Sequence, residues 1–199
     1  DSSILSKAHT QYSNIVETLE GVMLLGDEED YFSEGKVLIA AANPDMMEFY
    51  IEPHDLVILG NRYESQLCAI EMEAACIIVC EGAGVSMTIK KLAQERGCTV
   101  IATAYDTYTV ARLVNQSMPI SYFMKTDNLV TFDENDIIDE IKDVMASKRY
   151  RDFPILDKNG RYKGMISRRN LLGAQGKMLI LVDHNEKSQA VDGIENARI

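Results

Sequence analysis

The sequence lacks a basic surplus and a long apolar run, and both absences narrow the class of protein. Its 199 residues carry 20 Lys and Arg against 31 Asp and Glu, a net charge of −11. Binding to DNA or RNA needs a basic face, so the charge argues against a nucleic-acid partner. No apolar stretch approaches the ~20 residues that span a bilayer, and no signal segment begins at Asp1. We therefore expect a cytoplasmic protein with no membrane partner.

The sequence also lacks a CxxC pair, although it contains four cysteines at positions 68, 76, 80 and 98. A metal site or a redox pair would be the functional interpretation of these residues. Free cysteines are among the most buried residues of globular proteins, and disulfides are rare in the cytosol. We therefore predict buried free thiols inside an α/β core, in a reducing compartment.

Apolar residues make up 46% of the chain, which is enough to build a core, and the length allows one or two domains. Residues 3–19 have nearly helical spacing of apolar positions and predict a helix. From Lys36 to Ser117, the short apolar runs KVLIAA, DLVILG, CIIVC and CTVIATA alternate with amphipathic stretches. Strand–helix alternation of this length predicts an α/β fold with a parallel sheet. The uninterrupted apolar runs predict strands that are covered on both faces.

A second unit follows Met118-Pro119. The apolar residues at positions 137, 138, 141, 144 and 145 fall on one face of a predicted helix. Two strand candidates then flank Asn159-Gly160, and an Asn-Gly pair is the strongest short signal for a hairpin. With a strand before the helix and a helix beginning near Arg168, the order is β-α-β-β-α.

Two loops of the first unit offer weak candidate sites. Residues 81–84, EGAG, stand between a strand and a helix, where backbone N–H groups can hold a phosphate. No P-loop lysine follows and the full G-x-G-x-x-G spacing is absent, so we favour a tight turn. Asp106 could bind a ligand at the carboxyl edge of the sheet, but we favour a helix cap.

A cluster of basic and aromatic residues is the more informative motif. Residues 148–154 read KRYRDFP and precede the hairpin, and residues 167–170 read SRRN and follow it. The hairpin would bring both clusters to the same end of its sheet. Aromatic rings stack on bases and Arg pairs with phosphate, which suits a nucleotide. A solvated basic rim that faces an acidic partner chain remains an equal alternative.

Lys125 to Gly173 resembles a CBS domain, through DIIDEIKDVMAS, DFPILDKNGRYKGMIS and Gly164-x-x-Ser167-x-x-Asn170. The resemblance implies adenine-nucleotide binding, with phosphate and ribose at Ser167 and Asn170, the base at the backbone of Phe153 and Pro154, and phosphate at Arg168. It also implies stacking on Tyr150 and a second phosphate contact at Arg149. The family usually has Asp where this chain has Asn170, which keeps a ribose acceptor without its charge. CBS repeats work in pairs, and residues 1–21 resemble the trailing helix of a first repeat that this chain lacks.

The preceding segment resembles a DRTGG domain, through LVILGNRYESQLCAIE, IIVCEGAGVS and TVIATAYDTYTVARLVNQSMPISYFM, although the literal string D-R-T-G-G is absent. The end, MLILVDHNEKSQAVDGIENARI, is similar to the DHH-type catalytic domain of family II inorganic pyrophosphatases. That resemblance implies that Asp183 is a ligand of a Mn²⁺ or Co²⁺ pair, and carboxylate oxygen suits such ions. The family's H-x-x-x-D-x-D and D-H-H stretches are absent, so the metal site is incomplete here.

These resemblances together predict four parts: a helical segment (1–21), a DRTGG-type α/β domain (22–120), a second CBS repeat (121–176) and the start of a DHH domain (177–199). The implied function is regulation of a metal-dependent inorganic pyrophosphatase by AMP, ADP, ATP or a diadenosine polyphosphate. The parent enzyme would use Mn²⁺ or Co²⁺, with Mg²⁺, and the chain would form a homodimer. This segment alone should not hydrolyse pyrophosphate. The alternatives are a ligand-free dimerisation module and a sensor attached to another enzyme, such as an acyl-phosphate transferase.

Overall fold

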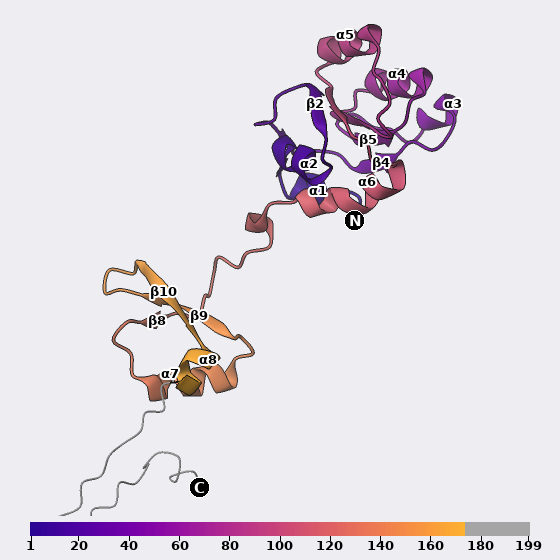
Figure 1. Cartoon of the computed structure of the whole chain (residues 1–199). Coiled ribbons are helices and arrows are strands. Elements are labelled where there is room, and N and C mark those ends of the chain that lie inside the picture. The colour runs from indigo at the N-terminus through magenta and orange to yellow at the C-terminus, as the bar shows by residue number, and fades with distance from the viewer. Residues whose placement is uncertain (174–199) are drawn as a thin grey trace, which may run out of the picture. The chain divides into compact units, whose positions relative to one another are not determined.

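A computed structural model describes residues 1–173 of the chain. Residues 1–124 form one compact unit, and a second unit begins at Lys125 (Figure 1). Within these residues, no helix has both the length and the apolar character needed to cross a membrane. Each unit is described separately below.

The first unit is built on a five-stranded sheet with the order β2-β7-β6-β5-β4. Four strands run parallel to one another: β4 (Val37–Ile39), β5 (Leu56–Leu59), β6 (Cys76–Val79) and β7 (Thr99–Ala102). The fifth strand, β2 (Val22–Leu25), pairs antiparallel with β7. Every residue of β5 and β6 is buried. The predicted parallel sheet with two covered faces is therefore confirmed.

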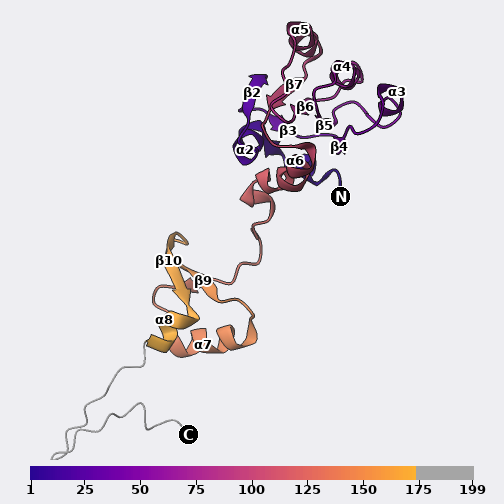
Figure 2. The ribbon, with the colours of Figure 1, turned by 45° about the vertical axis from the view of Figure 1, so that its right-hand side comes forward.

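Helices cover both faces of this sheet. Helices α3 (Pro44–Met47), α4 (Tyr63–Glu71) and α5 (Met87–Arg96) pack in a row on one face, while α2 (Tyr12–Thr18) and α6 (Thr107–Leu113) cover the other (Figure 2). The predicted limits of α5 are confirmed: the Ser86 hydroxyl accepts the Ile89 N–H, and Gly97 ends the helix with φ of 69°. The 3₁₀ turns η1 (Val114–Ser117) and η2 (Ile120–Tyr122) follow α6.

The single helix predicted over residues 3–19 is wrong. The segment forms two short helices, α1 (Ile4–Lys7) and α2, separated by β1 (Thr10–Gln11), which pairs with β3 (Tyr31–Phe32). The break follows from His9, whose φ is 50°, and from the Thr10 hydroxyl, which donates to the Leu5 carbonyl at 2.8 Å. The buried side chains of this segment, Leu5, Tyr12, Ile15 and Leu19, join the core of the first unit. The likeness to a trailing CBS helix stays a prediction.

The second unit has the predicted order β-α-β-β-α. Strands β8 (Phe132–Asp133), β9 (Asp152–Leu156) and β10 (Tyr162–Ser167) form a sheet of order β10-β9-β8. Helices α7 (Ile138–Ser147) and α8 (Arg168–Gly173) contribute to a small core made of Phe132, Ile141, Met145, Phe153 and Leu171. Ile137, predicted on the apolar face of the helix, instead precedes α7 and is 65% exposed.

The four cysteines are buried and free, as predicted. Burial raises the pKa of Cys80 and of Cys98 to about 12, and it raises the pKa of Cys76 well above its ordinary value. These thiols stay protonated at neutral pH, and a protonated thiol is a poor nucleophile. In the part of the chain that the structure describes, no three His, Cys, Asp or Glu side chains are grouped to hold a metal ion.

Candidate functional site

The β9–β10 hairpin brings the two predicted clusters to one end of the sheet of the second unit. Ser167, the last residue of β10, is the register partner of Asp152, the first residue of β9. The backbone N–H of Arg168 donates to the carbonyl of Arg151 at 3.2 Å. Residues 148–151 and 167–170 therefore meet at the point where α8 begins, as the sequence predicted.

Ser167 and Asn170 are bonded to one another. The Ser167 hydroxyl and backbone N–H both donate to Asn170 Oδ1, at 2.8 and 3.0 Å, and the Asn170 N–H donates to Ser167 Oγ at 3.3 Å. This reciprocal arrangement is a capping interaction for the first turn of α8. No acceptor in residues 1–173 is bonded to the Asn170 side-chain NH₂. That amide can still donate to a ligand hydroxyl or phosphate.

Arg168 has a structural contact that sequence reasoning missed. Its Nη2 donates to the carbonyls of Met145 and Lys148, at 2.6 and 3.0 Å. These carbonyls lie at the C-terminal end of α7, where a positive charge is favourable. The guanidinium has five N–H donors, so donors on Nε and Nη1 remain for a ligand. The predicted phosphate contact therefore has to share this side chain with the end of α7.

The two aromatic residues of the cluster differ in their environment. The Phe153 side chain is 1% exposed and packs on Phe132, with ring centroids 5.3 Å apart. It belongs to the core, and only its backbone can reach a ligand. Tyr150 is 48% exposed and meets Phe153 edge-on, at 6.3 Å and 81°. An open ring face is what stacking on a base requires.

Lys125 joins this site although no sequence pattern indicated its position. Its Nζ lies 5.7 Å from the centroid of the Tyr150 ring and 3.4 Å from the Tyr150 hydroxyl. Lys125 and Tyr150 are far apart in sequence, and no spacing rule connects them. The contact places a positive charge on the predicted stacking residue.

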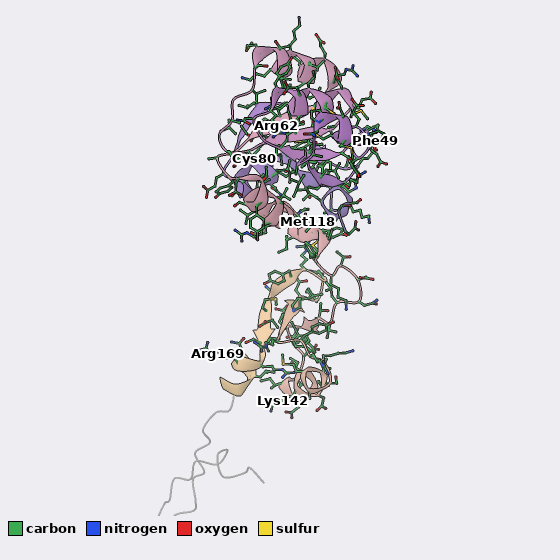
Figure 3. The ribbon with its side chains drawn as sticks, turned by 90° about the vertical axis from the view of Figure 1, so that its right-hand side faces the viewer. Phe49, Arg62, Cys80, Met118, Lys142 and Arg169 are labelled. Carbon is green, nitrogen blue, oxygen red and sulfur yellow. The ribbon has the colours of Figure 1, made fainter. Side chains whose placement is uncertain are left out.

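The site is basic in a chain of net charge −11. Arg149 is exposed and has no ion-pair partner among the residues that the structure describes. Arg151 and Arg169, which belong to the same two clusters, are also exposed, and Figure 3 labels Arg169. A local positive cluster concentrates anions, so the arrangement favours a ligand with phosphate groups. Pro154, half-buried in β9, lies opposite Met165.

The other candidates from the sequence have structural roles or cannot be placed. The Asp106 carboxylate accepts the Thr109 N–H at 2.7 Å and caps α6, as we favoured, and this bond lowers the pKa of Asp106. The backbone N–H groups of Glu81 and Gly82 donate to the carbonyls of Tyr105 and Thr103. They are not available to a phosphate, which confirms a structural turn. Asp183, the predicted metal ligand, and the predicted DHH segment lie outside the described residues.

The two folds define a DRTGG domain followed by a CBS domain. Residues 14–117 match the DRTGG domain family and residues 120–177 match the CBS domain family. Because the first match covers more than half of the sequence, the chain belongs to the DRTGG domain family. Both expected resemblances are confirmed.

The curated relatives connect this pair of domains with pyrophosphatases. The chain is 37% identical over 199 residues to the cobalt-dependent inorganic pyrophosphatase of Clostridium perfringens, covering all of this chain and 36% of that protein. It is 34% identical over 174 residues to the probable manganese-dependent inorganic pyrophosphatase of Thermotoga maritima, covering 85% of this chain and 32% of that protein. The chain thus spans about a third of the length of these relatives.

A solved structure supports the same assignment. The crystal structure of the CBS and DRTGG domains of the regulatory region of Clostridium perfringens pyrophosphatase, complexed with its activator diadenosine tetraphosphate, superposes with a TM-score of 0.77. The two chains are 36% identical, and the match covers 84% of this chain and 73% of the solved chain. The expected likeness to the regulatory region of a pyrophosphatase is confirmed.

Proposed function

We propose that this chain is the adenine-nucleotide-binding regulatory region of a metal-dependent inorganic pyrophosphatase. The observation that carries the proposal is its likeness, at 36% identity, to a regulatory region that was solved with diadenosine tetraphosphate. The parent enzyme hydrolyses pyrophosphate to two phosphates and uses Mn²⁺ or Co²⁺, with Mg²⁺. Such ions activate a water molecule for attack on a phosphoryl group. Asp183 is the residue of this chain that would hold the ion.

Within this proposal, each part of the nucleotide contacts particular residues of the second unit. The exposed ring of Tyr150 stacks on adenine, whose edge meets the backbone of Phe153 and Pro154. Arg149 and the remaining donors of Arg168 bind phosphate. The Asn170 side-chain NH₂ donates to ribose or phosphate as it stands. The Ser167 hydroxyl can donate to the ligand only when its bond to Asn170 Oδ1 opens.

The symmetry of the relative's ligand supports the proposal of a homodimer. Diadenosine tetraphosphate has two identical ends, and one CBS repeat offers the residues for one adenosine. A two-fold axis would place two copies of the site on the two ends of one ligand, as closed homo-oligomers commonly do. The nucleotide then regulates catalysis if it binds more tightly to one of two arrangements of the dimer.

Calorimetric titration of the 199-residue chain tests the binding step. AMP, ADP, ATP and diadenosine tetraphosphate are titrated, with GMP as the base control. Arg149→Ala is expected to weaken adenine-nucleotide binding about tenfold or more, because a charge-assisted hydrogen bond is lost. Arg96→Ala, an exposed arginine at the end of α5 in the other unit, is the matched control and should bind normally. Equal binding of AMP and GMP, or no effect of Arg149→Ala, would contradict the proposal.

Arg168 requires a separate experiment because it also holds the end of α7. We expect Arg168→Ala to lower the free energy of unfolding of the second unit by about 1 kcal/mol without nucleotide. A ligand present at 100 times its Kd adds about 2.7 kcal/mol to stability. If Arg168 also binds phosphate, Arg168→Ala will lose part of this increment. A variant that keeps the full increment would show that Arg168 is only structural.

A ligand-free dimerisation module is the second candidate, and exposed apolar side chains favour it. Tyr162 is 65% exposed and Met165 is 52% exposed, both on β10. Such a module would dimerise in sedimentation experiments without nucleotide, and Met165→Asp would abolish the dimer. A regulatory module would instead change its sedimentation when the adenine nucleotide is added.

A further inference from the structure

A polar pocket lies in the first unit, at the carboxyl ends of β4 and β5. It has a volume of about 210 Å³ and is lined by Ala40, Ala41, Ala42, Gly60, Asn61, Arg62 and Ser65. Helix α4 begins at this pocket, and Arg62 is labelled in Figure 3. The proposed nucleotide site of the second unit uses none of these residues.

The first turn of α4 offers backbone donors to the pocket. The N-cap residue, Arg62, provides no side-chain cap, and the first bonded N–H of the helix is that of Gln66, to the Arg62 carbonyl at 3.1 Å. Within residues 1–173, the N–H groups of Tyr63, Glu64 and Ser65 therefore have no acceptor. Helices α5 and α6 differ, because Ser86 and Asp106 cap them. An uncapped first turn binds anions through these N–H groups and the helix dipole.

The Ser65 hydroxyl is the second, independent indication of a ligand. Ser65 is only 4% exposed, and its hydroxyl has no hydrogen-bond partner in the described part of the chain. Every fully enclosed side-chain nitrogen or oxygen among those residues has a hydrogen-bond partner. Because the Ser65 hydroxyl has none, it is not fully enclosed. We infer that it opens onto the pocket that Ser65 lines. A hydroxyl that opens onto a pocket takes its hydrogen-bond partner from water or from a ligand there. A ligand oxygen in the pocket would satisfy it.

A hydrogen bond from α4 holds the loop that carries these groups. Gln66 is 2% exposed, and its Nε2 donates to the Gly60 carbonyl at 3.1 Å. Gly60 is thereby fixed between the end of β5 and the first turn of α4. The exposed Arg62 guanidinium has no ion-pair partner among residues 1–173. A positive charge and a set of oriented donors thus stand at the same place.

We propose that this pocket binds a phosphoryl group. Arg62 pairs with its charge, the N–H groups of residues 63–65 and the Ser65 hydroxyl donate to its oxygens, and the Asn61 amide lies at the rim. Pockets for drug-sized ligands have about 300–1,000 Å³. The volume of about 210 Å³ suits a phosphoryl group better than a whole nucleotide. This site is separate from the CBS site, and it stands whether or not the proposed function is correct.

The phosphoryl group has two chemical sources, inorganic phosphate or a phosphomonoester. An apolar pocket of about 230 Å³ adjoins the site and shares Ala40 and Ala42 with it. Met47, Tyr50 and Ile51 line this neighbouring pocket. It could hold the apolar group of a phosphomonoester, and a comparison of phenyl phosphate with inorganic phosphate distinguishes the two sources.

Amide NMR of the ¹⁵N-labelled 199-residue chain tests the proposal. Inorganic phosphate is titrated against sodium chloride of matched ionic strength, and the amide signals of residues 63–65 should shift with one saturating curve. Arg62→Ala should weaken binding about tenfold or more, and Ser65→Ala by several fold. Arg96→Ala and Arg149→Ala should leave the curve unchanged, the latter because it lies in the other site.

The outcomes separate the sources and the sites. Tighter binding of phenyl phosphate that Tyr50→Ala removes would identify a phosphomonoester, while equal binding would identify inorganic phosphate. Amides 63–65 that do not move with phosphate or phenyl phosphate would overturn the proposal. Phosphate-induced shifts of amides 63–65 that persist in both Arg62→Ala and Ser65→Ala would also overturn the proposal. If Arg62→Ala fails to fold, it is replaced by Arg62→Gln, which keeps a polar side chain and removes the charge.

Discussion

The two sheets of this chain are covered to different extents. In the first unit, β5 and β6 are buried along their whole length, with helices on both faces. In the second unit, the buried core contains five residues, and β10 leaves Tyr162 and Met165 more than half exposed. The central strands of the first sheet are thus fully covered, although Val22 in its edge strand β2 is 61% exposed, while the second sheet leaves apolar side chains of its hairpin uncovered.

This difference explains why the two units are suited to different tasks. A domain of about 60 residues buries only about 60% of its unfolded surface, so it is marginally stable alone. The second unit is therefore expected to gain stability from a ligand or from another repeat. The same binding increment changes the folded fraction most for a unit near the threshold of stability, which suits a regulatory site.

Core truncation gives the largest expected effect and tests this comparison directly. Phe153→Ala, at 1% exposure, should cost about 3–5 kcal/mol and unfold the second unit outright. Ile78→Ala, at 0% exposure in β6, should cost about 2–5 kcal/mol, yet the first unit should stay folded. Urea denaturation followed by NMR signals of each unit measures both. A second unit that stays folded with Phe153→Ala would contradict the expectation that this unit is marginally stable.

Gly35→Ala should have the next largest effect, within the first unit. Gly35 has φ of 86°, and an added Cβ would lie 2.6 Å from the carbonyl carbon of His54 and 2.9 Å from the N of Asp55. Because both are backbone atoms, we expect a loss of about 3 kcal/mol in the free energy of unfolding. Gly97→Ala is the control: its φ is 69°, but no atom lies near its Cβ position. It should cost about 1 kcal/mol, and equal losses would contradict the steric argument.

The smallest expected effect concerns pH and the cap of α6. The hydrogen bond from Thr109 lowers the folded-state pKa of Asp106 below its ordinary value of 3.8. A lowered folded-state pKa means that the cap stabilises the first unit above about pH 4 and that this contribution is lost as the pH falls through the folded-state pKa. The melting temperatures of the native chain and Asp106→Asn should therefore converge as the pH falls below the folded-state pKa of Asp106. Ser86→Ala removes a cap without a titrating group, so its difference should stay constant with pH.

Much of the fold could be predicted from local signals. The apolar runs of β5 and β6 predicted a parallel sheet buried on both faces, and Ser86 and Gly97 fixed the limits of α5. The Asn159-Gly160 turn set the hairpin and hence the meeting of Arg151 with Arg168. Each of these features depends on neighbours that are close in sequence.

The rest depended on contacts between distant residues. The break between α1 and α2 requires the pairing of β1 with β3, which a helical period cannot reveal. The contact of Lys125 with Tyr150 and the contact of Arg168 with the end of α7 are formed only in the folded unit. Asn61, Arg62 and Ser65 carried no motif, because their shared pocket also needs the three alanines that follow β4.

The antiparallel pairing of β2 with β7 has a consequence for synthesis on the ribosome. Val22 is the partner of Ala102, and the Leu19 carbonyl accepts the Thr103 hydroxyl at 2.7 Å. The early strand therefore waits for about eighty further residues before its partner exists, which takes roughly 4–16 s at elongation rates of about 5–20 residues per second. During that interval, Met23 and Leu25 have no partner strand to pair with. A chaperone that binds short apolar segments would have its longest opportunity there.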